Sequence, residues 1–132
     1  QGVGGKKKVT ILGISYKPNV DDTRESPVIK LVKLFEEESN CELSIFDPHV
    51  RNFNHEGHNC QKHMSKDIYS AAEGSHLIIL GVNHEAFGKV DFELLYKKMA
   101  SPYILDTRNF WDKKALSRIG FNYCLLGDGR TL

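Results

Sequence analysis

Short apolar runs alternate with amphipathic segments along the chain. Residues 9–14 (VTILGI) are apolar at nearly every position and include a glycine near the end, which is typical of a strand buried on both faces of a sheet. The other segments with the composition of short strands are residues 43–46, 76–82, 103–106 and 122–125. The pattern therefore predicts a sheet with residues 9–14 near its centre.

Amphipathic segments separate these strands. Residues 27–38 begin with Ser26-Pro27, an N-cap residue followed by a proline in the first turn, and carry apolar side chains at helical spacing. Residues 68–73 and 92–99 are the other helix candidates. This alternation predicts an α/β fold: a doubly wound, mostly parallel, five-stranded Rossmann-like sheet with helices on both faces. In such a fold, ligands bind at the carboxyl ends of the strands.

The loop after the first strand, residues 15–25 (SYKPNVDDTRE), is charged and contains no glycine. The GxGxxG fingerprint that brings a dinucleotide pyrophosphate to the backbone is therefore absent. Lys17 and Arg24 are candidates to bind phosphate or carbonyl oxygens. The acids of the loop, which would order it or accept ribose hydroxyls, are Asp21, Asp22 and Glu25. Charge alone leaves open the alternative of a solvated loop with salt bridges.

The composition is that of one soluble globular domain. The chain has 132 residues, 40% of them hydrophobic, and a formal net charge of +1, so no overall field favours nucleic acid or an anionic membrane. No apolar stretch precedes the first strand, and we expect neither a signal peptide nor a membrane anchor. Residues 1–7 are interpreted as a linker or expression remnant, and residues 8–132 as the domain.

The cysteines and histidines suggest no disulfide and no metal. Cys41, Cys60 and Cys124 are an odd number without CxxC spacing, which favours packing or surface thiols in a reducing cytoplasm. Soft ligands do gather in one segment, but their spacing matches no zinc pattern, so a metal switch is the less favoured hypothesis: His55, His58, Cys60 and His63.

Polar residues also follow the later strands. His84 and Glu85 could form a general acid/base pair by position, although a structural role at the edge of the site is favoured. Asp47 stands where a dinucleotide-binding domain carries its ribose-binding acid. Without the glycines, Asp47-Pro48 is interpreted as a strand stop.

Several of these segments together resemble a known family. KPNVDDTRESP after VTILGISY is similar to the start of the C-terminal domain of the UDP-glucose/GDP-mannose dehydrogenase family. FDPHV, LIILGVNHEAF and LDTRN resemble that domain's later signatures in the same order, at residues 46–50, 77–87 and 105–109. The resemblance implies the nucleotide-sugar-binding end domain of a larger enzyme, which oxidises the C6 alcohol of a UDP-sugar to a carboxylate with NAD in polysaccharide biosynthesis.

The resemblance also implies roles for particular residues. Lys17 and Arg108 would contact the UDP part of the substrate, and Arg24 would reach NAD held mainly by an N-terminal domain of the same protein. For Arg24, an ion pair with Asp21 or Asp22 is the alternative. The implied partners are that NAD-binding domain and a central dimerisation helix, in a homo-oligomeric parent protein.

The family's catalytic cysteine belongs to a glycine-flanked motif that surrounds no cysteine of this chain. We therefore expect no catalytic residue here and no activity from the chain alone. The alternative function is a stand-alone α/β nucleotide-binding or regulatory module without redox activity. A short natural gene product would favour that alternative, and a much longer one would favour the dehydrogenase.

Overall fold

A sheet of five parallel strands forms the centre of the computed structural model, which describes residues 7–20, 23, 26–38, 40–50, 54–55, 58–59 and 61–126. The strand order is β2-β1-β5-β6-β7. These strands are β1 (Lys7–Leu12), β2 (Cys41–Phe46), β5 (Leu77–Leu80), β6 (Tyr103–Asp106) and β7 (Asn122–Leu125). A separate antiparallel pair consists of β3 (Asn54–His55) and β4 (His58–Asn59).

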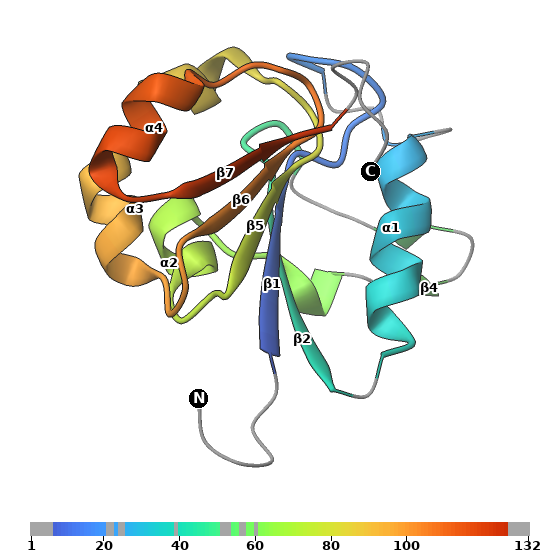
Figure 1. Ribbon diagram of the computed structural model, residues 1–132. Coiled ribbons are helices and arrows are strands. Elements are labelled where there is room, and N and C mark those ends of the chain that lie inside the picture. Colours follow the sequence, from blue (N-terminus) through green and yellow to red (C-terminus); the bar gives the residue numbers. More distant parts are fainter. Residues whose placement is uncertain are drawn as a thin grey trace.

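Helices cover both faces of this sheet (Figure 1). One face carries α1 (Pro27–Glu36), and the other carries α2 (Ile68–Ala72), α3 (Phe92–Lys98) and α4 (Lys113–Ile119). Short 3-10 helices lie in two connections, η1 (Gln61–His63) and η2 (Glu85–Lys89). The predicted doubly wound parallel sheet is confirmed. β1 is an inner strand as predicted, while β5 is the central one.

The start of α1 is determined by local sequence. The Ser26 side chain accepts a hydrogen bond from the backbone N–H of Val28 at 3.3 Å, and Pro27 stands in the first turn. A proline there costs no helical hydrogen bond, because the first amides of a helix have no partner within it. The helix ends at Glu36 rather than at residue 38 as the pattern predicts.

The sequence pattern did not predict α4, because its seven residues (KKALSRI) include only three apolar side chains and so show little amphipathic pattern. Its local signal is Asp112, whose side chain accepts a hydrogen bond from the backbone N–H of Lys114 at 3.0 Å. An aspartate N-cap of this kind is a recognisable helix start even where the apolar pattern is too short to interpret.

The strands bury side chains on both faces, as parallel strands covered by helices do. In β5, Ile79 joins the apolar cluster under α1, while Ile78 and Leu80 join the cluster under the other helices. Ile11 and Leu12 divide in the same way in β1, and both are fully buried. The near-continuous apolar runs of these two strands therefore reflect two separate cores.

Two glycines allow β1 and β5 to lie against each other at their carboxyl ends. A Cβ on Gly13, whose φ is +90°, would lie 2.8 Å from Val82. A Cβ on Gly81 would lie 2.8 Å from the Gly13 carbonyl and 2.9 Å from the Val28 side chain. The connection after β1 runs to the α1 face of the sheet, and the connection after β5 runs to the opposite face. Ligand sites of open α/β sheets lie at the point where two neighbouring connections diverge in this way.

We expect Gly13→Ala to lower the free energy of unfolding by about 2–5 kcal/mol, because it adds a backbone clash to the strain of a positive φ. Gly74→Ala is the matched control, since Gly74 has φ +73° with no atom within 4 Å of its Cβ position. It should cost about 1–2 kcal/mol. Urea unfolding of both variants measures the difference, and equal losses would contradict the close approach of β1 and β5.

Candidate functional site

The loops after β1, β2, β5 and β6 open on one edge of the sheet, at the carboxyl ends of its strands. Lys17 lies in the loop after β1 and Arg108 in the loop after β6, and both are exposed. β1 and β6 flank β5, so their axes are about 10 Å apart at the usual spacing of strands. Both cations therefore stand in loops at the same edge of the sheet, and their predicted contact with one ligand stays a prediction. Arg24 lies outside the described residues.

Arg108 is held in place by the backbone around it. The Asp106 carboxylate accepts a hydrogen bond from the Arg108 backbone N–H at 2.8 Å, and Arg108 Nε donates to the Gly81 carbonyl at 3.0 Å. The Thr107 hydroxyl donates to the Leu80 carbonyl at 2.7 Å. Because the bond to Gly81 uses Nε, the terminal nitrogens of the guanidinium remain the donors that suit an oxyanion.

Asp106 organises the rest of this loop from a fully buried position. Its second carboxylate oxygen accepts hydrogen bonds from the backbone N–H groups of Phe110 and Trp111, both at 2.9 Å, and from the Tyr123 hydroxyl at 2.6 Å. Burial and the bond to Asp106 raise the pKa of Tyr123 well above its usual range. Tyr123 therefore stays protonated and donates, and the loop that carries Arg108 is rigidly attached to β6 and β7.

On the other side of β5, the buried carboxylate of Asp47 also orders loops by accepting hydrogen bonds. One of its oxygens accepts hydrogen bonds from the backbone N–H groups of Ile14 and Ser15, at 2.7 and 3.3 Å, and from His84 Nε2 at 2.9 Å. Its other oxygen accepts from the His49 backbone N–H at 2.8 Å. As the sequence predicts, β2 ends just before Asp47. The Asp47 carboxylate also links the loop after β2 to the loops after β1 and β5.

Burial alone would raise the pKa of Asp47, but its hydrogen bonds outweigh that effect. The donors are His84 Nε2 and the backbone amides of Ile14 and His49, and the resulting pKa lies below the ordinary value of 3.8. Asp47 is therefore ionised at neutral pH. His84 is fully buried and hydrogen-bonded, in agreement with the structural role favoured from the sequence over acid/base chemistry.

The described cysteines lie on strands and not in the loops of this edge. Cys41 begins β2 at the opposite end of the sheet, and burial raises the pKa of its thiol, which makes it a poor nucleophile. Cys124 lies on the outer strand β7 within the sheet rather than in a loop of the edge. Cys60 lies outside the described residues.

The histidine-rich segment takes part in other contacts. His63 Nε2 lies 2.7 Å from a carboxylate oxygen of Glu36 on α1. The backbone of His55 lies opposite that of His58 in the hairpin of β3 and β4, and the side chains of these two residues lie outside the described part of the structure. Within the part of the chain that the structure describes, no three His, Cys, Asp or Glu side chains are placed to hold a metal ion.

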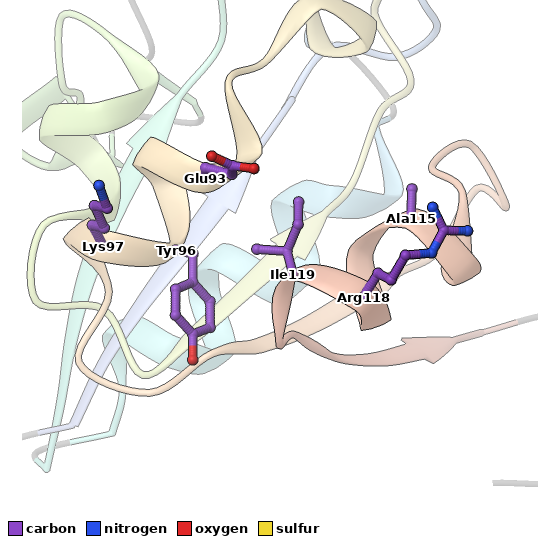
Figure 2. A pocket seen from close by; sticks show the side chains of 6 residues that line it. All are labelled: Glu93, Tyr96, Lys97, Ala115, Arg118 and Ile119. Carbon is purple, nitrogen blue, oxygen red and sulfur yellow. The ribbon is translucent and has the colours of Figure 1, made fainter.

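The surface has one cavity at the carboxyl edge and another between α3 and α4. One borders Arg108 and Thr107 at the carboxyl edge and is otherwise walled mainly by α1; Lys17 does not line it, so the two cations do not share a closed cavity. The other lies between α3 and α4, and Figure 2 shows the residues that line it: Glu93, Tyr96 and Lys97 on one helix, and Ala115, Arg118 and Ile119 on the other. Both of these helices lead into the amino ends of strands, so their C-terminal turns lie far from the carboxyl edge.

No helix in the described ranges is long and apolar enough to span a bilayer.

The fold and the edge together define a parallel α/β domain that presents an ordered arginine and an exposed lysine on loops held by buried carboxylates. Residues 10–113 match the UDP-glucose/GDP-mannose dehydrogenase family, UDP binding domain. The chain belongs to this family, and the family resemblance found in the sequence is confirmed.

Relatives with known names match nearly the whole chain. The UDP-N-acetyl-D-mannosamine dehydrogenase of Methanocaldococcus jannaschii is 35% identical over 94% of this chain and 28% of its own length. The UDP-glucose 6-dehydrogenase of Mus musculus is 32% identical over 92% of this chain and 27% of its own. The structure of UDP-D-ManNAc dehydrogenase from Pyrococcus horikoshii superimposes with a TM-score of 0.75 and 26% identity, over 96% of this chain and 27% of that one. The chain thus spans about a quarter of the length of these relatives.

The Asp47 network generates a prediction about pH. A carboxylate whose pKa is lowered by folding contributes stability above its unfolded pKa, and that contribution is lost as the pH falls through the folded pKa. At pH 7, Asp47→Asn should therefore lower the free energy of unfolding by about 1–3 kcal/mol. The difference from the wild type should begin to shrink below about pH 4, where the Asp47 carboxyl of the unfolded chain protonates, and should be lost as the pH falls through the lower pKa of the folded state.

Urea unfolding between pH 7 and pH 3 measures this effect. Asp91→Asn is the control, because Asp91 is an exposed N-cap of α3 and asparagine caps equally well. A difference between Asp47→Asn and the wild type that stays constant down to pH 3 would contradict an ionised, hydrogen-bonded Asp47.

Proposed function

We propose that this chain binds the UDP part of a nucleotide sugar at the carboxyl edge of its sheet. We further propose that it does so as the C-terminal domain of a larger NAD-dependent nucleotide-sugar 6-dehydrogenase, which oxidises the C6 alcohol to a carboxylate. The observation that carries the proposal is the family match at residues 10–113, which includes both Lys17 and Arg108. The names of the relatives, dehydrogenases of UDP-N-acetyl-D-mannosamine and UDP-glucose, support the class of substrate.

The chemistry of the edge suits a diphosphate. Arg108 offers the terminal nitrogens of a guanidinium whose Nε is already bound to the Gly81 carbonyl, so little side-chain freedom is lost when an anion binds. Lys17 supplies a compact ammonium from the loop on the other side of β5. A charge-assisted hydrogen bond of this type contributes about 1.5–3 kcal/mol.

We infer that the turn after β1 does not bind NAD. In a dinucleotide-binding turn, the pyrophosphate lies against backbone amides of the glycine-rich turn and of the helix N-terminus that follows it directly. Here the N–H groups of Ile14 and Ser15 both donate to the Asp47 carboxylate, and the Gly13 N–H donates to the Phe46 carbonyl at 2.9 Å. We infer that the cofactor of the parent enzyme is held mainly by its other domain, and that Arg24 reaches towards it from the loop after β1.

The proposal predicts that Lys17→Ala and Arg108→Ala each weaken UDP-sugar binding in the full-length parent by about 1.5–3 kcal/mol with little effect on folding. The matched controls are Lys97→Ala and Arg118→Ala, which remove the same charges from the cavity between α3 and α4 in Figure 2. Arg24→Ala should instead weaken NAD binding more than UDP-sugar binding. Calorimetric titration of each ligand measures these effects, and wild-type UDP-sugar affinity in both Lys17→Ala and Arg108→Ala would remove the assignment.

A second prediction concerns the chain by itself. We infer that the turn after β1 does not bind NAD, and no described cysteine stands in a loop of the carboxyl edge. The isolated chain should therefore not reduce NAD with UDP-glucose or UDP-N-acetyl-D-mannosamine. The absorbance of NADH at high protein concentration tests this expectation. Turnover by a preparation free of any host dehydrogenase would contradict it.

A further inference from the structure

A fully buried histidine, His84, joins the loops of the carboxyl edge. Its Nε2 lies 2.9 Å from an Asp47 carboxylate oxygen and 3.3 Å from the Ser15 hydroxyl, and its Nδ1 lies 2.8 Å from the backbone nitrogen of Asn19. The rings of His49 and Phe87 pack against the imidazole at centroid distances of 4.6 and 5.5 Å. Both nitrogens of the imidazole therefore have partners, and these come from two other loops.

These partners determine which nitrogen carries the proton. The ionised Asp47 carboxylate only accepts hydrogen bonds, so His84 Nε2 must be protonated to donate to it. The backbone N–H of Asn19 only donates, so Nδ1 must be unprotonated to accept from it. His84 is thus the neutral Nε2–H tautomer, and its two nitrogens have separate tasks.

The Nδ1 bond supports the loop that carries Lys17. Asn19 has a φ of +64°, in the left-handed region that asparagine adopts more readily than most residues with a side chain. Its backbone N–H is held by His84 Nδ1, and its side-chain oxygen accepts from the Glu85 backbone N–H at 2.9 Å. At the start of the loop, the Ser15 hydroxyl donates to the Lys17 carbonyl at 2.7 Å. Lys17 is therefore exposed at the middle of a segment that is anchored on both sides.

We propose that His84 is a positioning residue for ligand binding: through its Nδ1 bond to Asn19 it holds the loop so that Lys17 faces the ligand, while its Nε2 bond to Asp47 fixes the ring. This inference rests on the proposed binding of UDP at this edge. Its physical basis is preorganisation, because apparent affinity falls with the fraction of molecules whose loop has the binding conformation.

Two substitutions separate the tasks of the nitrogens. In His84→Asn, the side-chain oxygen can occupy the position of Nδ1 and accept from Asn19, but the donor to Asp47 is lost. In His84→Gln, the side-chain nitrogen can occupy the position of Nε2 and donate to Asp47, but the acceptor for Asn19 is lost. A control for the loss of a backbone acceptor is His76→Gln, since His76 Nδ1 accepts from the Lys8 backbone N–H at 3.0 Å at the opposite end of the sheet.

The experiment titrates UDP into each ¹⁵N-labelled variant of this chain, follows the backbone amide signals, and measures stability by urea unfolding. We expect His84→Gln to bind UDP about threefold to tenfold more weakly than the wild type, as for the loss of one neutral hydrogen bond. His84→Asn should bind within about twofold of the wild type although it is the less stable of the two, because Asp47 has lost a donor. His76→Gln should bind UDP normally.

A merely structural histidine predicts a different order, in which UDP affinity follows stability and His84→Asn is the weaker binder. That order, or wild-type affinity in His84→Gln, would overturn the inference. The ¹⁵N shifts of the wild-type imidazole provide a test that needs no variant, since a protonated Nδ1 would also overturn it.

Failure of the proposed function would be recognised separately. If UDP shifts no amide signal at the carboxyl edge of the wild type, UDP binding by this chain is contradicted, and with it a role for His84 in that binding. Whether His84 positions the loop is then tested without ligand, by comparing the backbone amide signals of Lys17 and Asn19 in His84→Gln with those of the wild type. Unchanged signals there would show that His84 does not position the loop at all.

Discussion

The buried carboxylate of Asp47 is the interaction on which the arrangement of the carboxyl edge depends. It lies at the end of β2 and accepts hydrogen bonds from backbone or side-chain donors of the loops after β1, β2 and β5. A buried charge is tolerated only where hydrogen bonds replace its hydration, so the loops must keep the positions that supply those bonds. Loss of any one donor leaves the charge less well compensated, which makes the three loops one cooperative unit.

Asp106 repeats this arrangement at the end of β6. Its carboxylate receives backbone N–H groups of its own loop and the Tyr123 hydroxyl, and that loop presents Arg108. Each proposed cation of the site thus stands beside a buried acid that orders the backbone rather than binding the ligand. The separation of tasks has a physical reason, because an acid that met the diphosphate directly would repel it, whereas an acid saturated by amides contributes order with little negative potential at the surface.

The same hydrogen bonds support the proposal that this domain does not hold the dinucleotide itself. The backbone amides after β1 are occupied by Asp47 instead of being open to a pyrophosphate, and Gly13 serves the close approach of β1 to β5 rather than that of a ligand. A sheet of the same architecture therefore offers side-chain cations from neighbouring loops where a dinucleotide fold offers a helix N-terminus. Architecture alone does not determine the ligand, and the partners of a few backbone amides distinguish the two cases.

The sequence by itself determined the strands, the start of α1 and the edge on which Lys17 and Arg108 lie, because these depend on local apolar periodicity, on the Ser26-Pro27 pair and on the shared direction of parallel strands. The helix α4 carries too few apolar side chains for that signal. Only the tertiary structure decided that the Asp47 carboxylate accepts hydrogen bonds from several backbone amides, and that His84 bonds to both Asp47 and Asn19. The residues bonded to His84 are separated from it by 37 positions for Asp47 and 65 for Asn19. The periodicity of a sequence indicates which side of a helix or strand is buried. Which distant residues form hydrogen bonds depends instead on the order of the strands in the sheet, and the alternation of strands and helices along the chain does not determine that order.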